Sequence, residues 1–95
     1  MGVGDVKSNL SSISDGAYLD IQPPSGEEWV IHNIYHEDDC ELYFSDGTNE
    51  ILISSHSGNG GWLGYWFHVT NSRYLRVKNV SGSSALIGYD GVQTK

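Results

Sequence analysis

Apolar residues recur at every second position along most of this sequence, and turn-forming residues interrupt them at short intervals. In segment 17–22, Ala17, Leu19 and Ile21 alternate with polar or aromatic neighbours. A period of two is typical of β-strands that bury one face, whereas helices repeat every 3.6 residues. No segment has a convincing helical period, so the sequence predicts an all-β protein.

Seven segments show strand-like patterns, and Gly, Pro or Asp-Gly turns separate them. These segments are 17–22, 28–36, 40–44, 50–55, 62–70, 73–80 and 85–93. A weaker eighth strand is expected near 5–14, where serines replace the alternation. Short strands at this spacing predict an antiparallel β-sandwich of jelly-roll-like topology with seven or eight strands.

The chain of 95 residues suits one domain, which we place at 16–95. Residues 1–15 are expected to form an N-terminal arm, either mobile or paired with a neighbouring chain. No linker or internal repeat divides the remainder.

Two of the predicted strands carry large apolar residues on both faces. In 28–36, strict alternation assigns Ile31 and Tyr35 to one face, and Ile34 and His36 to the other. A small monomer has one core, so one of these faces would be left in water unless a partner covers it.

The aromatic segment 62–70 follows the glycine loop 58–61. Alternation directs Tyr65 and Phe67 to the core and Trp66 and His68 to the opposite face, while Trp62 at the loop junction could take either side. Three uses of these rings stay open: an interface with another chain, plain core packing, or a platform for sugars formed by Trp62 and Trp66. The first of these is favoured.

Charge narrows the range of partners. The formal net charge is −7, which is unlike the basic surface of a nucleic-acid-binding protein. The few cations cluster as Arg73, Arg76 and Lys78, which either face solvent or pair with acidic turns of a neighbouring copy. We therefore add these three residues to the predicted interface of Trp62, Tyr65, Trp66 and His68. No apolar run is long enough for a membrane span, and no apolar leader begins the chain.

No constellation of residues points to catalysis, a metal or another cofactor. His32 and His36 lie four positions apart, which on a strand separates them by about 13 Å, too far to share a zinc ion. Glu37, Asp38 and Asp39 form an acidic turn that, even with Glu41, lacks the spacing of a calcium loop. Cys40 cannot form an internal disulfide because it is the single cysteine, and neighbouring carboxylates disfavour its thiolate. We expect a protein that is not an enzyme.

Three phrases carry a resemblance to a known group: "PPSGEEWVIHNIYH", "TNSRYLRVKNVSG" and "ALIGYDGVQTK". Together they resemble small β-sandwich structural proteins of tailed bacteriophages, over nearly the whole chain from Gly16. The resemblance implies a capsid decoration, or cement, protein that binds the major capsid protein and itself, with a trimer favoured. It also implies synthesis in the host bacterial cytoplasm and a final place on the capsid surface of the virion. The alternative is a carbohydrate-binding module or phage tail/adsorption protein that stacks glycans on Trp62 and Trp66.

Overall fold

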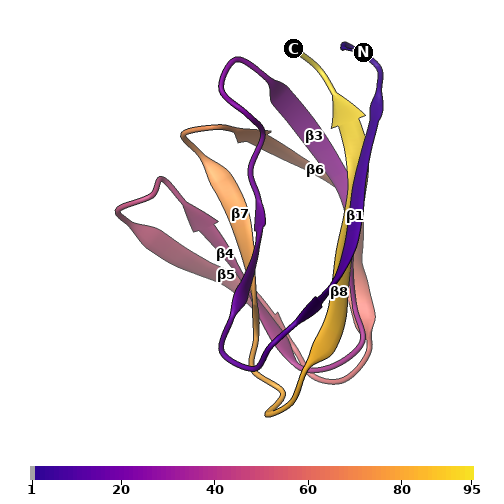
Figure 1. Cartoon of the computed structure of the whole chain (residues 1–95), viewed down its shortest axis with the longest axis vertical. Helices are drawn as coiled ribbons and strands as arrows, with labels where there is room; N and C mark the ends of the chain where they lie inside the picture. Colours follow the sequence, from indigo (N-terminus) through magenta and orange to yellow (C-terminus); the bar gives the residue numbers. More distant parts are fainter. Residues whose placement is uncertain (1) are drawn as a thin grey trace.

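The computed structural model describes residues 2–95, which fold into two four-stranded antiparallel sheets packed face to face (Figure 1). The strands are β1 (Val6–Ile13), β2 (Tyr18–Ile21), β3 (Glu28–His36), β4 (Cys40–Ser45), β5 (Glu50–His56), β6 (Gly60–Thr70), β7 (Tyr74–Asn79) and β8 (Ala85–Gln93). No helix in this part of the chain is long and apolar enough to cross a membrane. The predicted all-β sandwich is confirmed.

The strands pair in a nested order. Sheet A has the order β1-β8-β3-β6, and sheet B has the order β2-β7-β4-β5. Each strand of the first half of the chain therefore pairs with one of the second half, as in a single long hairpin rolled into two layers. We interpret this order as jelly-roll-like. The β4–β5 hairpin projects away from β1 and β8 at one side of the molecule (Figure 1).

The expected separate arm at 1–15 needs correction. Val6–Ile13 pair over their whole length with β8 of the same chain, from Val6 opposite Val92 to Ile13 opposite Ala85. This part of the chain is one of the two edge strands of sheet A. Alternation was a poor guide here because an edge strand made mostly of serine and other polar residues buries few side chains.

The core lies between the sheets and is built mainly from aliphatic side chains. Ile31, Ile34 and Ile87 from sheet A and Leu42 and Val77 from sheet B are almost completely buried. Complete burial of each such side chain contributes about 1.5–3 kcal/mol. The alternation predicted in 73–80 and 85–93 is confirmed, with Leu75, Val77, Ala85, Ile87 and Tyr89 inside.

The faces predicted for 28–36 are correct only up to Ile31. The pairing of β3 with both β6 and β8 shifts register between Ile31 and Asn33, which marks a β-bulge. Beyond it, Ile34 and His36 point into the core and Tyr35 points to solvent, the reverse of strict alternation from Trp29. An inserted residue exchanges the two faces of everything that follows.

A buried asparagine closes the end of the sandwich where β7 leaves sheet B. The Asn79 Nδ2 group donates to the carbonyls of Ile13 and Ser83 at 2.8 and 2.7 Å, and its Oδ1 accepts from the Ser81 amide at 2.9 Å. One side chain thus satisfies backbone groups from β1 and from the β7–β8 turn.

Replacing Asn79 with alanine should lower the free energy of unfolding by about 2–4 kcal/mol, because it leaves buried backbone groups without partners. Asn59→Ala, at an exposed loop asparagine, is the matched control and should change it by less than about 0.5 kcal/mol. Urea denaturation followed by circular dichroism measures both. A loss of equal size in the two variants would contradict the role of Asn79.

Candidate interaction surface

The outward side of sheet A exposes an unusual number of large apolar side chains. Its strands alternate, so positions that do not face the core share one surface. We call this surface the apolar face; its exposed members are Val6, Leu10, Tyr35, Leu63, Trp66 and Leu86. Polar Ser8, Asn33 and Asp90 lie between these residues on the same face. Exposed large apolar side chains gathered on one face of a monomer often mark a contact with a partner.

A local distortion of β6 presents Trp66 at this face. Ile31 pairs with Phe67 and Asn33 pairs with Leu63, so three residues of β6 lie opposite one residue of β3. Gly64, within the distortion, has φ of +73°, a conformation that glycine adopts without strain. The Asn33 side chain holds the distortion in place, because its Oδ1 accepts from the Gly64 amide at 2.9 Å and its Nδ2 donates to Asp90 at 2.8 Å.

The structure separates the two tryptophans that the sequence left undecided. Trp66 is 72% exposed, and its ring lies edge-on to His32 at 5.1 Å. Trp62 is only 3% exposed and packs in the core. The expectation that Trp62 contacts a partner or a sugar is therefore wrong. The glycine loop delivers the chain to β6 with Trp62 pointing inward.

Tyr65 and His68 are both exposed at the surface. Tyr65 was expected in the core, but it is 48% exposed and stacks on Phe67, with 5.1 Å between the ring centres. Phe67 does pack against the core, as predicted. His68 is exposed, as expected for the face that carries Trp66. Tyr65, Trp66 and His68 thus remain available to a partner.

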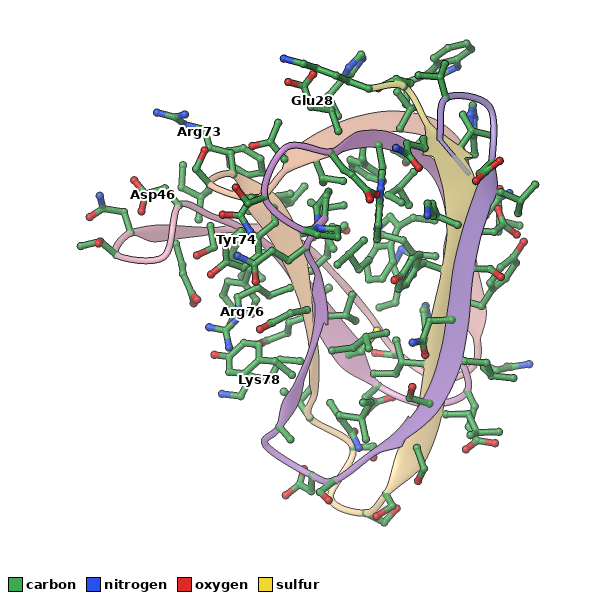
Figure 2. The ribbon with its side chains drawn as sticks, turned by 45° about the horizontal axis from the view of Figure 1, so that its top comes forward. Glu28, Asp46, Arg73, Tyr74, Arg76 and Lys78 are labelled. Carbon is green, nitrogen blue, oxygen red and sulfur yellow. The ribbon has the colours of Figure 1, made fainter. Side chains whose placement is uncertain are left out.

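The predicted basic residues lie elsewhere. Arg76 and Lys78 project from β7, on the outward side of sheet B, and Arg73 lies in the exposed turn before β7 (Figure 2). The sequence predicted that these basic residues share one interface with Trp66. Arg76 and Lys78 instead lie on sheet B, whereas Trp66 lies on sheet A.

Within sheet B, Arg76 is already paired inside its own chain. Its Nε donates to Asp20 at 2.6 Å, its Nη1 donates to Glu50, and its guanidinium lies 3.9 Å from the centre of the Tyr18 ring. The hydrogen bond to Asp20 is the main cause of the raised pKa of Arg76; burial acts in the opposite direction, and the hydrogen bond to Glu50 adds to the rise. The ammonium group of Lys78 lies over the same Tyr18 ring, 5.7 Å from its centre. The surroundings of Arg76 are therefore satisfied within the chain, although β5 of the same sheet exposes the apolar residues Ile51, Leu52 and Ile53.

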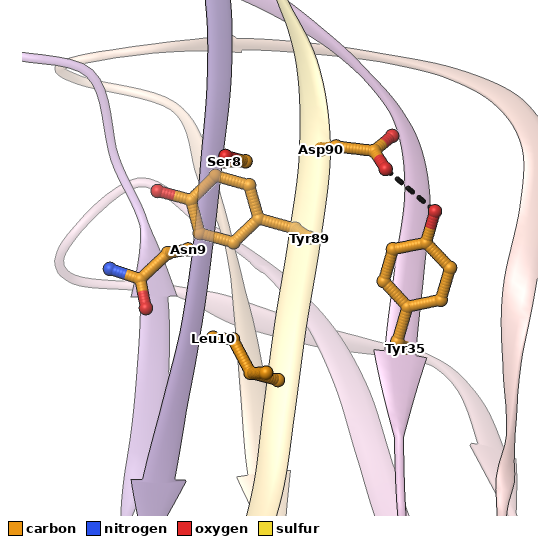
Figure 3. Close-up of a pocket in the computed structure, with 6 residues that line it drawn as sticks. All are labelled: Ser8, Asn9, Leu10, Tyr35, Tyr89 and Asp90. Atoms are coloured by element: carbon orange, nitrogen blue, oxygen red, sulfur yellow. Dashed lines mark hydrogen bonds between the residues drawn. The ribbon is translucent and has the colours of Figure 1, made fainter.

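A hollow of 460 Å³ opens on sheet A between β1, β8 and β3 (Figure 3). Its lining residues are Ser8, Asn9, Leu10, Tyr35, Tyr89 and Asp90. The Tyr35 hydroxyl donates to Asp90 Oδ2 at 2.6 Å, and this hydrogen bond is the main cause of the raised pKa of Tyr35. Its walls are mostly apolar, so the hollow can receive an apolar side chain of a partner.

The cysteine and histidines considered for catalysis or metal binding lie in surroundings that do not suit these roles. Burial, and then the charges of Asp39 and Glu41, raise the pKa of the Cys40 thiol to about 12, so this cysteine stays protonated at neutral pH. Among residues 2–95 no group of three or more His, Cys, Asp or Glu side chains could hold a metal ion. His36 does not approach His32; it points inward and lies 2.8 Å from His56.

Sequence reasoning missed two features of the molecule. Leu10 and Leu86 belong to the apolar face, but Leu10 lies in the serine-rich segment that was treated as an arm. The contact between His36 and His56 joins residues 20 positions apart, and no local spacing indicates it. The weak eighth strand expected near 5–14 is β1, but without alternation the sequence does not assign Leu10 to a face; the histidine contact had no comparable indication.

The two tryptophans should respond differently to truncation. Trp62→Ala should lower the free energy of unfolding by about 3–5 kcal/mol because it empties core volume. Trp66→Ala should change it by less than about 0.5 kcal/mol, when the protein is dilute enough to be monomeric. Urea denaturation measures both values. Similar losses for the two variants would show that Trp66 also packs in the core.

No family model matches this sequence, and no curated protein matches it. Among solved structures, the chain is similar to capsular polysaccharide assembling protein CapF from Staphylococcus aureus, with a TM-score of 0.45 and 11% sequence identity. The match covers 99% of this chain and 25% of that chain, so the protein described here spans a quarter of the length of CapF. A similarity at this level carries no argument about function.

Proposed function

We propose that this protein is a non-enzymatic structural protein of a tailed-bacteriophage virion, which decorates the capsid and stabilises the assembled shell through protein–protein contacts. The observation that carries the proposal is the apolar face. The resemblance of the sequence to small phage β-sandwich proteins supplies the class of partner: further copies of the chain, as a trimer, and the major capsid protein.

The composition of the apolar face is that of a protein contact. More than half of the surface of Trp66, Leu63 and Leu10 is accessible to solvent in each case. A tryptophan at the centre of a contact can contribute 2 kcal/mol or more, as an order of magnitude, once water is excluded around it. Aromatic residues are also enriched in protein contacts relative to the rest of a protein surface. Burying these side chains against another chain removes apolar area that the monomer leaves wet.

The two outward faces of the sandwich differ in a way that suits attachment to a shell. Sheet B presents an internally paired network around Arg76, with Asp20 and Glu50 as its acidic partners. These paired charges are stable in water without a partner. We infer that sheet A turns toward neighbouring protein and sheet B toward solvent, and that the net charge of −7 keeps the outer surface hydrated.

The mechanism is linkage between binding and assembly. A protein that binds the assembled shell and not its free subunits stabilises the shell by mass action, and no chemical step is needed. Synthesis in the host cytoplasm and final location on the capsid surface follow from this role.

Trp66→Ser should weaken association by about 2 kcal/mol or more, roughly thirtyfold in Kd. Light scattering on the purified protein measures self-association, and co-sedimentation measures binding to shells assembled from the major capsid protein of the same genome. Val80→Ser, at an exposed apolar residue in the β7–β8 turn, is the matched control and should bind as the parent protein does. A strict monomer that never sediments with shells would overturn the proposal.

A second candidate function, glycan binding, is favoured by one observation. The exposed Trp66 ring has polar neighbours that could bond to hydroxyl groups, with His32 at 5.1 Å and His68 two positions along the strand. Exposed aromatic rings beside polar groups can stack on the apolar side of a sugar. This function would use Trp66 and not Trp62.

Titration with glycans separates this candidate from capsid decoration. Binding at Trp66 should shift the tryptophan fluorescence, and Trp66→Ala should abolish the shift while Trp29→Phe retains it. Trp29 is buried, so its replacement leaves the surface unchanged. A glycan array without a single ligand would eliminate this candidate.

A further inference from the structure

Two histidines meet at the end of the sandwich where β5 turns into β6. His36 Nε2 of β3 lies 2.8 Å from His56 Nδ1 of β5, and His36 Nδ1 lies 3.1 Å from the carbonyl oxygen of Asp38. His36 is only 5% exposed and His56 is half-buried. A direct hydrogen bond between two imidazoles is sensitive to protons because a neutral ring has one accepting nitrogen, which becomes a donor when the ring is charged.

The hydrogen bonds fix the tautomers of the neutral pair. A carbonyl oxygen only accepts, so His36 Nδ1 carries a proton and donates it to Asp38. His36 Nε2 is then an acceptor, and His56 Nδ1 must donate to it. The two neutral rings therefore form a continuous chain of hydrogen bonds from β5 to the β3–β4 turn.

This pair fastens the β5–β6 loop to the rest of the sandwich. The His56 ring stacks on Trp62 with ring centres 4.0 Å apart and planes 14° apart. The Gly58 amide donates to Asp39 Oδ1 at 2.6 Å, which is a second tie between this loop and the β3–β4 turn. Trp62 Nε1 has no hydrogen-bond partner among the described residues, so Trp62 contributes packing alone.

The surroundings of the pair hold few groups that could compensate a second charge. From the β3–β4 turn, the Asp39 carboxylate is occupied by Gly58, and the Asp38 carboxylate accepts from the Asp39 amide. Glu37 is turned toward the Leu86 amide. From β4, the neutral thiol of Cys40 lies opposite His56; β8 places Ile87 opposite His36, and β6 contributes Gly60 and Trp62.

We propose that His36 and His56 form a proton-sensitive latch, which holds the β5–β6 loop on the sandwich while the pair carries at most one extra proton and releases it when both rings are charged. One extra proton is tolerated because a charged His56 still donates from Nδ1 to the neutral His36. A second proton removes the remaining acceptor, so that two N–H groups and two positive charges face each other across 2.8 Å.

The electrostatics of His36 agree with this sequence of events. Burial, and then the charge of His56, lower the pKa of His36, while the backbone of Asp38 and Gly58 and the charge of Asp39 act in the opposite direction. A lowered pKa means that the folded state prefers the neutral ring. The contribution of His36 to stability is therefore complete above the ordinary histidine pKa of about 6.5 and is lost as the pH falls below it.

Hydrogen exchange observed by NMR tests the latch on the whole protein. Between about pH 7.5 and about pH 5, where histidine is the side chain that ordinarily titrates, the protection of the Gly58 amide should fall at least about fivefold after correction for intrinsic exchange. The Trp62 indole N–H should lose protection with it, whereas core amides such as Ile31 and Val77 should keep theirs.

Two variants remove the second charge and keep the bond. His36→Gln places an amide oxygen where it can accept from His56, and His56→Asn places an amide N–H where it can donate to His36. Each should keep the loop protected at about pH 5. His56→Asn changes the half-buried partner, so it preserves the test if His36→Gln fails to fold. His32→Gln and His68→Gln are the matched controls and should behave as the parent protein.

Three results would overturn the latch. The first is a Gly58 amide whose protection is the same at both pH values in the parent protein. The second is an unchanged response in both His36→Gln and His56→Asn. The third is a parallel loss of protection at Ile31 and Val77, which would show general unfolding in place of local release.

Discussion

The register shift between Ile31 and Asn33 is the constraint on which the rest of the molecule depends. β3 lies inside sheet A, so the shift affects its pairing with β6 and with β8 together. It turns Ile34 and His36 into the core, and the matching distortion of β6 turns Trp66 out. Asn33 stabilises the shift by bonding to a glycine of one neighbour and an aspartate of the other. A side chain at the irregularity thus sets both the core and the exposed surface.

The outward faces of the two sheets differ in how far their side chains are paired within the chain. On sheet B, Arg76 bonds to two carboxylates and lies on an aromatic ring, so its surroundings are satisfied within the chain. On sheet A, the apolar side chains of Trp66, Leu63 and Leu10 remain exposed to solvent. The proposed attachment to neighbouring protein accounts for this difference, because such side chains gain from a partner what they lack in the monomer.

The density of aromatic residues around the glycine loop has two separate causes. Trp62 belongs to the interior and supports the stacked His56 and the bond between His56 and His36. Trp66, four residues later, belongs to the surface. The loop therefore connects a buried, proton-sensitive cluster at the start of β6 with an exposed aromatic surface further along the same strand.

The sequence by itself determined the all-β class, seven of the eight strands, and the inward faces of β7 and β8, because alternation with a period of two is a local property. Residues 5–14 gave only a weak strand pattern, since an edge strand with few buried side chains has little alternation to show. Only the tertiary structure decided that Trp62 is inside, that Arg76 and Trp66 lie on different sheets, and that His36 meets His56. Those outcomes depend on a bulge and on pairings between distant segments, and the spacing of neighbouring residues does not encode either.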